Sequence, residues 1–172
     1  EWMAQQPGSW YGMLLAHFGV AVFVIGVTVV NGFQVEKDLR MSPGESTEIA
    51  GLRVRFEGVR EQRGPNYIAA RGTLQLTRGE RHLATLQPER RNYLVSRMPM
   101  TETAIDRGFT RDLYVSLGEP LGGNAWSVRV YYKPFVDWIW GGCLLMALGG
   151  LVAISDRRYR LKKSAASKPA MQ

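Results

Sequence analysis

The sequence has a single cysteine, Cys143, and only two histidines, His17 and His82, among its 172 residues. One cysteine excludes a disulfide within the chain, so the fold must be held by its apolar core and by any membrane tethers. Cys143 lies inside a long apolar run, where a small thiol packs against neighbouring helices and is chemically inert. We therefore expect a structural role for it rather than a redox role.

Charge is nearly absent from two stretches, residues 11–33 and 135–154, in which Asp137 is the only Asp, Glu, Lys or Arg. About 20 apolar residues cross a hydrocarbon core of about 30 Å. Aromatic residues, which favour membrane interfaces, lie near their predicted ends. These are Trp2, Trp10, Tyr11, Tyr131, Tyr132, Trp138 and Trp140. The sequence predicts two transmembrane helices, 11–33 and 135–154.

Residues 1–10 contain no Lys or Arg, and the apolar run that follows exceeds the core of a signal peptide. We therefore expect a membrane span at 11–33 rather than a cleavable secretion signal. The start at Glu1, with no initiating Met, indicates a segment of a longer polypeptide.

A basic tail, residues 155–172, follows the second run and carries six Lys or Arg against Asp156 alone. The positive-inside tendency places this tail, and with it the lead-in 1–10, on the cytoplasmic side, so residues 34–134 lie outside. Residues 34–134 are thus on the side of the membrane away from DNA, so the net charge of +7 does not indicate nucleic-acid binding, and no nucleic-acid partner is predicted. We interpret the tail as a topological anchor that contacts anionic lipid headgroups. We expect the Ala/Ser/Lys/Pro stretch after Lys163 to be disordered.

The middle region, residues 34–134, reads as a β domain. Leu52, Val54 and Phe56 alternate with Arg53, Arg55 and Glu57, and residues 126–133 alternate in the same way. Further short strands are expected around 74–76, 83–86, 93–95 and 113–117. Turn residues separate them at Gly58, 64–66, 78–79, 87–88, Gly108, 118–120 and 122–124. Six or seven strands at this spacing predict an all-β fold, either a small sandwich or a partly open barrel.

Arginines on the outward faces of these strands, such as Arg53, Arg55 and Arg129, permit two interpretations. They can form a solvated surface that protects edge strands from pairing. Alternatively they form a basic face for an acidic partner or a carboxylate ligand, which the planar guanidinium can hold through two hydrogen bonds. The sequence does not decide between them.

His17 lies six positions into the first predicted span, about 9 Å below its cytoplasmic end at about 1.5 Å per residue. Ionisable side chains at that depth usually face protein or a cavity. A neutral imidazole there either hydrogen-bonds a neighbouring helix or serves as an axial ligand to haem iron. Gly12, Ala16 and Gly19 form a small-residue stripe that would let a helix or a flat macrocycle approach, more commonly the former.

The remaining polar candidates have simpler explanations. We expect His82 to be an exposed turn or strand residue. Asp106, Arg111 and Asp112 are close in sequence, but a solvated turn explains them better than acid/base chemistry. No residue of this chain is predicted to be catalytic.

Several motifs together resemble one family. They are residues 15–19 (LAHFG), 64–67 (GPNY), 84–91 (ATLQPERR), 100–106 (MTETAID), 108–114 (GFTRDLY) and 126–136 (WSVRVYYKPFV). The chain resembles, over nearly its whole length, the C-terminal portion of the CcmF family, the haem lyase subunit of cytochrome c maturation. The chain also resembles the homologue dedicated to nitrite reductase haem attachment, and these residues do not separate the two.

The resemblance implies a bacterial inner-membrane protein whose central domain is periplasmic. It implies that His17 is an axial ligand to a b-type haem (haem b), with the second ligand outside this chain. The implied activity is covalent attachment of haem to apocytochrome c at the outer membrane face. The implied partners are a haem chaperone, apocytochrome c and the thiol-handling and apocytochrome-presenting subunits of the maturation system.

The sequence also lacks parts of a complete family member, which has many more spans and a tryptophan-rich segment flanked by two histidines. Two hypotheses therefore remain. In one, the chain is part of a haem lyase with His17 as ligand. In the other, it is a membrane-anchored interaction module, an assembly scaffold without cofactor or catalysis, in which His17 only packs.

Overall fold

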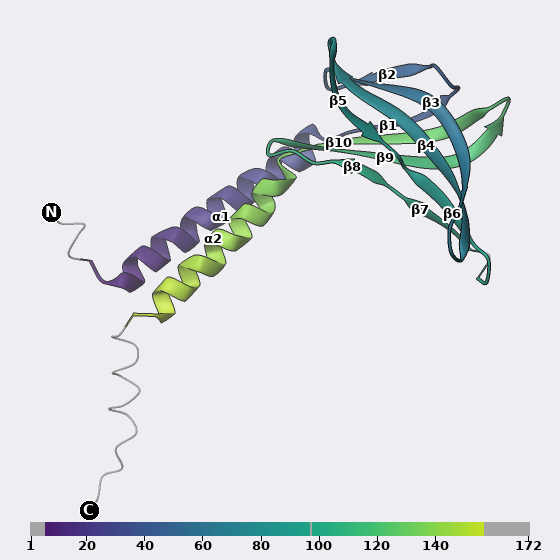
Figure 1. Ribbon diagram of the computed structural model, residues 1–172. Coiled ribbons are helices and arrows are strands. Elements are labelled where there is room, and N and C mark those ends of the chain that lie inside the picture. Colours follow the sequence, from purple (N-terminus) through teal and green to yellow (C-terminus); the bar gives the residue numbers. More distant parts are fainter. Residues whose placement is uncertain (1–5, 97, 157–172) are drawn as a thin grey trace, which may run out of the picture. The chain divides into compact units, whose positions relative to one another are not determined.

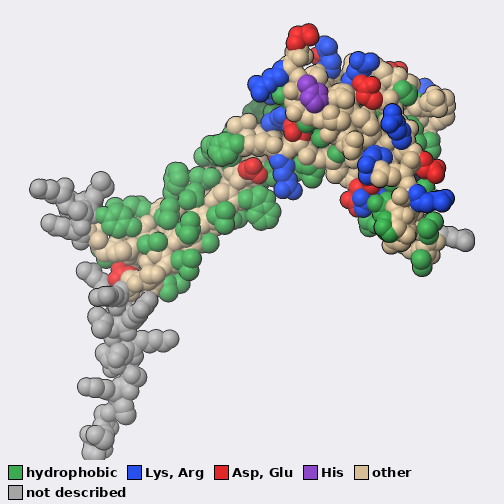
Figure 2. Space-filling view, in the orientation of Figure 1, with side chains coloured by type: hydrophobic (Ala, Val, Ile, Leu, Met, Phe, Trp, Pro, Cys, Tyr) green, Lys and Arg blue, Asp and Glu red, His purple; other side chains and the backbone are tan. Residues whose placement is uncertain are grey.

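The computed structural model describes residues 6–96 and 98–156, which form two compact units (Figure 1). One unit contains two apolar helices, α1 (Gly8–Phe33) and α2 (Val136–Ile154). Both are long and apolar enough to cross a membrane. Apolar side chains cover their visible surface, whereas charged side chains of both signs gather over the strands (Figure 2). The other unit, residues 30–135, is a β domain.

The two helices pack antiparallel along a seam of glycines spaced seven residues apart. Gly12, Gly19 and Gly26 are buried on α1, and Gly142 and Gly149 are buried on α2. A Cβ atom at Gly12 would lie 2.6 Å from the carbonyl oxygen of Gly149, and one at Gly149 would lie 2.6 Å from that of Gly12. The helix backbones are thus in direct contact, which only small residues permit.

Ten strands make up the described part of the β domain. They are β1 (Val35–Met41), β2 (Ser46–Ile49), β3 (Leu52–Arg63), β4 (Tyr67–Arg78), β5 (Arg81–Leu86), β6 (Glu89–Tyr93), β7 (Pro99–Glu102), β8 (Ala104–Asp106), β9 (Arg111–Gly122) and β10 (Ala125–Pro134). One sheet has the order β1-β10-β9-β8. The other has the order β2-β3-β4-β6-β7, with β5 also pairing with β4. All the pairings are antiparallel.

The core lies between the two sheets, which makes the domain a β-sandwich. Leu52, Val54 and Phe56 of β3 are fully buried, as are Leu74 and Leu76 of β4. The facing sheet contributes Leu113, Val115, Leu117, Val128 and Val130 to the same cluster. Because successive strand residues point to opposite faces, the alternating positions of the sequence supply one inward row per strand.

The two long strands β3 and β4 hold the second sheet together. The first half of β4 pairs with β6 and its second half with β5. In β3 the register shifts between Phe56 and Gly58, so Glu57 is an extra residue in a β-bulge. Gly58 adopts a φ of 124°, which favours glycine. The bulge exchanges the two faces of the strand, so that Val59 packs on the core while Arg60 is exposed.

The prediction of two apolar helices flanking an all-β domain is confirmed. The expected number of strands, six or seven, was wrong, because the described part of the domain has ten. Two of the expected turns were also wrong. The strands β7 and β8 are too short to show an alternation of apolar and polar residues, and β1 has charged residues along most of its length, so these three strands were not predicted. Gly58 is a bulge and not a turn, and residues 118–120 belong to β9, which runs on to Gly122. Val95, expected in a strand, lies beyond the end of β6 and is 94% exposed.

Parts of the predicted lead-in and tail, residues 1–5 and 157–172, lie outside the described residues, as does Arg97. The expectations for the basic tail and for the disorder after Lys163 therefore remain expectations.

Candidate functional site

His17 lies on α1 between Gly12 and Gly19, but on the side of the helix away from the glycine seam. At about 100° per residue, it lies roughly 150° around the helix from Gly12 and Gly19. Its ring is exposed on the described surface of the helical unit. The small-residue stripe expected beside the histidine therefore faces α2, and its packing explanation is the one that the structure supports.

The imidazole of His17 is oriented by its own helix. Its Nδ1 lies 2.8 Å from the carbonyl oxygen of Met13, one turn earlier. A carbonyl oxygen only accepts hydrogen bonds, so Nδ1 carries a proton and donates; in the neutral imidazole the lone pair is then on Nε2. None of the described residues hydrogen-bonds Nε2. This is the tautomer and orientation that metal-binding histidines commonly show.

The surroundings of His17 fit one axial bond to haem iron and do not fit a cluster of protein ligands. Neighbouring side chains on the exposed part of α1 are apolar and 45–61% exposed: Met13, Leu14, Phe18, Val20, Val24 and Ile25. Within residues 6–96 and 98–156, no group of three His, Cys, Asp or Glu could hold a metal ion. A single imidazole nitrogen in an apolar setting suits a flat, largely apolar macrocycle, which needs few protein ligands.

His82 lies on β5 in the β domain and is exposed, as expected. Its Nε2 lies 2.7 Å from Oε1 of Gln75 on the adjacent strand and 3.2 Å from Oγ1 of Thr85. These polar contacts occupy the ring at the sheet surface, so His82 has an ordinary cross-strand role.

The Asp106, Arg111 and Asp112 group holds the connection between β8 and β9. Arg111 pairs with Asp106, and the backbone N–H of Gly108 donates to Oδ1 of Asp112 at 3.2 Å. Asp112 is only 3% exposed, so the expected solvated turn is instead a partly buried one. The group is used in hydrogen bonds that fix the turn, which supports the structural explanation.

The arginines named from the sequence are paired with carboxylates of this chain. Arg53 lies 3.0 Å from Glu48, and Arg55 lies 3.4 Å from Glu57. Arg129 donates to Asp38 on β1, and this bond raises its pKa above the ordinary value. Because β3 and β10 are interior strands of their sheets, edge protection does not explain these residues.

Sequence reasoning missed a buried ionic network around Glu89 on β6. Glu89 is 5% exposed and pairs with Arg71 on β4 and with Arg91, whose Nε lies 2.8 Å away. Arg91 also pairs with Glu102 on β7 at 3.1 Å and lies over the ring of Tyr67. Burial acts to raise the pKa of Glu89, but the hydrogen bonds from Arg91 and Arg71 outweigh it and lower this pKa.

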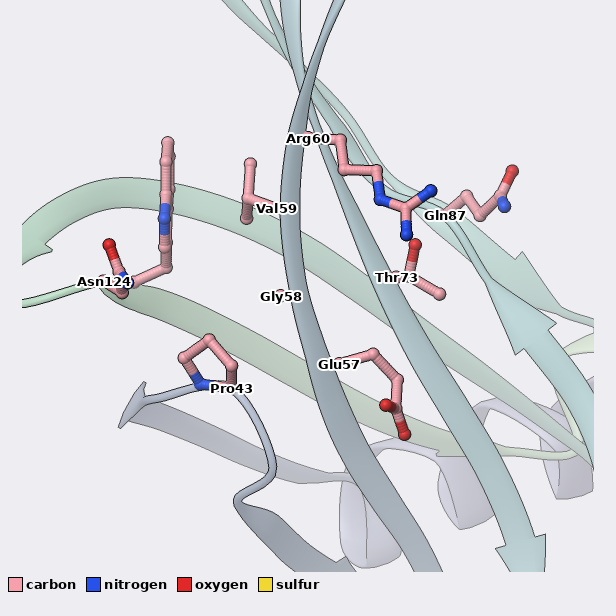
Figure 3. Close-up of a pocket in the computed structure, with 9 residues that line it drawn as sticks. Pro43, Glu57, Gly58, Val59, Arg60, Thr73, Gln87 and Asn124 are labelled. Carbon is pink, nitrogen blue, oxygen red and sulfur yellow. The ribbon is translucent and has the colours of Figure 1, made fainter.

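A polar cleft of about 500 Å³ opens beside this network, over the bulge in β3 (Figure 3). Arg60, Thr73 and Gln87 lie on one side of the strand, and Val59, Asn124 and Pro43 on the other. Trp126 completes the lining. A second cleft of about 340 Å³ shares Arg60, Thr73 and Gln87 and is also lined by Glu61, Gln62 and Arg71.

Comparison with known proteins agrees with this architecture of two apolar helices and a β-sandwich. Residues 32–134 match the family described as the CcmF C-terminal beta-sandwich. This chain belongs to the CcmF family.

Relatives cover nearly all of the chain. It is 52% identical over 154 residues to the cytochrome c-type biogenesis protein CcmF of Pseudomonas aeruginosa, covering 90% of this chain and 23% of that protein. The CcmF of Haemophilus influenzae is 51% identical over 88% of this chain and 24% of its own length. A solved structure titled cytochrome c heme lyase CcmF has the same fold, with a TM-score of 0.67, 24% identity, and coverage of 84% of this chain and 24% of that one. The chain spans about a quarter of the length of the curated relatives it matches.

Proposed function

We propose that this chain is part of a cytochrome c haem lyase, with His17 as one axial ligand of a b-type haem in the membrane. The observation that carries this proposal is the free Nε2 of His17, aimed away from the helix seam by the bond to Met13. The chain also belongs to a family whose members include cytochrome c-type biogenesis proteins and a haem lyase.

Each residue of the site then has a defined task. His17 would supply one bond to the iron through Nε2, and the hydrogen bond from Nδ1 to the Met13 carbonyl orients the ring. Exposed apolar side chains such as Leu14 and Phe18 would cover the macrocycle and exclude water. A haem bound here would supply one-electron chemistry. In this proposal the second axial ligand comes from outside this chain.

The same proposal gives the chain an orientation. The six Lys and Arg of residues 155–172 favour a cytoplasmic C-terminus. The β domain then lies in the periplasm of a bacterial cell, on the side where haem is attached to apocytochrome c. In this position it offers a docking platform for the haem chaperone, the apocytochrome and the thiol-handling subunits.

Substitution of His17 tests the haem assignment directly. The full assembly is purified in detergent, and the reduced absorption spectrum is recorded for the unmodified protein and for His17→Ala. We expect loss of the b-type signal at unchanged protein level, and partial recovery when millimolar imidazole is added, because imidazole can fill the space left by the side chain.

His82→Ala is the matched control, since it removes the other histidine of the chain and should leave the spectrum intact. An unchanged b-type signal in His17→Ala would contradict the haem assignment. The chain would then be better described as a membrane-anchored interaction module without its own cofactor.

A further inference from the structure

The outer face of the β3-β4-β6-β7 sheet carries a row of four charged residues, one from each strand. Arg60 lies opposite Arg71, Arg71 opposite Glu89, and Glu89 opposite Glu102. Like charges directly opposite one another on neighbouring strands repel. The row therefore needs compensation at both ends.

The charges are paired at the β6-β7 end of the row but not at the β3 end. Arg91, two residues after Glu89 on β6, pairs with both Glu89 and Glu102, and Arg71 pairs with Glu89. The two glutamates are thus shared by Arg71 and Arg91. Among residues 6–96 and 98–156, no carboxylate pairs with Arg60, which stands beside the positive charge of Arg71.

The bulge at Glu57 is the reason that Arg60 lies on this face. Without the extra residue, the alternation of β3 would point Arg60 into the core and Val59 outward. Bulges commonly re-aim side chains next to binding sites. Here the bulge places an unpaired guanidinium in the larger cleft, with Thr73 and Gln87 beside it (Figure 3).

The lining of the two adjoining clefts suits a carboxylate carried on an extended peptide. The Arg60 guanidinium, the Thr73 hydroxyl and the Gln87 amide can all donate hydrogen bonds to an anion. Trp126, half-buried at the other end, offers an aromatic surface. Two carboxylates also lie in the linings. Glu57 is paired with Arg55 at 3.4 Å, and Glu61, next to Arg60 in the chain, forms no ion pair with it among the described residues.

We propose that this groove, from Trp126 past Gly58 to Arg60 and Thr73, binds an acidic peptide segment from outside this chain. A carboxylate of the segment pairs with Arg60, and an apolar side chain of the segment packs on Trp126. The groove is independent of the haem assignment, because it lies entirely in the β domain and uses none of the residues around His17.

Peptide binding to the full chain in non-ionic detergent tests this site. The probe is acetyl-Gly-Phe-Gly-Asp-Glu-Gly-amide carrying a neutral fluorophore, and binding is followed by fluorescence anisotropy at low salt. We expect saturable binding that Arg60→Gln weakens about tenfold, since a hydrogen bond to a charged group is lost. Thr73→Val should weaken it by a smaller factor.

Arg53→Gln is the matched control, because it removes an exposed arginine of the same strand outside the groove. It should leave binding unchanged, and the probe with Asn-Gln in place of Asp-Glu should not bind. Arg60→Gln should melt at the same or a higher temperature, because it relieves repulsion with Arg71. Absent binding, an equal loss in Arg53→Gln, or displacement by free phosphate at the same concentration as free peptide would overturn the proposal.

Discussion

The hydrogen bonds of two side chains, His17 and Glu89, decide what each can do chemically. The bond from His17 to the Met13 carbonyl favours the tautomer of the neutral imidazole in which the outward-facing Nε2 holds the lone pair. The bonds from Arg71 and Arg91 to Glu89 keep a buried carboxylate ionised. The hydrogen-bond partner thus orients the His17 ring, and for Glu89 it decides whether the buried side chain is charged.

Glu89 gives a prediction for the dependence of stability on pH. Its pKa is lowered in the folded state, so its stabilising effect is present above the unfolded pKa, about 4.3, and is lost as the pH falls through the folded value. Glu89→Gln should lower the free energy of unfolding at pH 7 by about 2 kcal/mol and flatten its decline in acid. Denaturant unfolding at several pH values measures both effects.

Glu119→Gln is the control for that experiment. Glu119 also pairs with an arginine, Arg90, but its side chain is 76% exposed, and exposed pairs contribute only about 0–1 kcal/mol. An equal effect of the two substitutions would show that the burial of Glu89 does not matter.

At the level of elements, the glycine seam fixes the distance between α1 and α2. A Cβ atom at Gly19 would lie 2.7 Å from the backbone nitrogen of Met146 and 2.8 Å from the carbonyl oxygen of Gly142. The neighbouring atoms are backbone and cannot move aside without separating the helices. The seam also leaves the His17 side of α1 available to other groups.

Gly19→Ala should therefore destabilise the helix pair by about 1–3 kcal/mol through overpacking, even though alanine is the better helix former. The measurement is thermal unfolding of the full chain in detergent, followed by circular dichroism at 222 nm. At Gly150 of α2 a Cβ atom would meet nothing within 4 Å, so Gly150→Ala should melt at an equal or higher temperature. Equal melting temperatures for the two variants would contradict the close packing.

Sequence patterns predicted those elements whose period is visible. The apolar runs gave both helices, and the alternation in β3, β9 and β10 gave the core rows. The ionic network could not be predicted, because residues 89–91 read as a charged stretch, and Glu89 is buried only when β4, β6 and β7 come together. The bulge at Glu57 could not be predicted either, because an extra residue in one strand is recognised only from its pairing with the neighbouring strand.

At the level of the whole molecule, the chain has two units with separate interiors. The helices pack through glycine backbone, whereas the β domain is held by a core centred on residues such as Phe56 and Leu74. Units with separate cores can lose structure in separate transitions. Changes in the core of one unit should therefore leave the chemistry of the other intact.

Phe56→Ala tests this separation. Phe56 is fully buried, and its truncation should lower the unfolding free energy of the β domain by about 3–5 kcal/mol. In the purified assembly below the melting transition, the reduced spectrum ascribed to His17 should not change. Val95→Ala, at a position 94% exposed, should change stability by less than about 0.5 kcal/mol. A parallel loss of the spectrum in Phe56→Ala would show that the two units are energetically coupled.

The single inserted residue in β3 makes that strand sensitive to length as well as to composition. Removal of one residue at Glu57 would turn the remainder of the strand over, so that Arg60 would enter the apolar interior and Val59 would face water. Every residue from Gly58 to Arg63 would keep its identity and exchange its environment. A deletion there would exchange the inward and outward faces of the rest of the strand, and would be more damaging than any substitution at the same position.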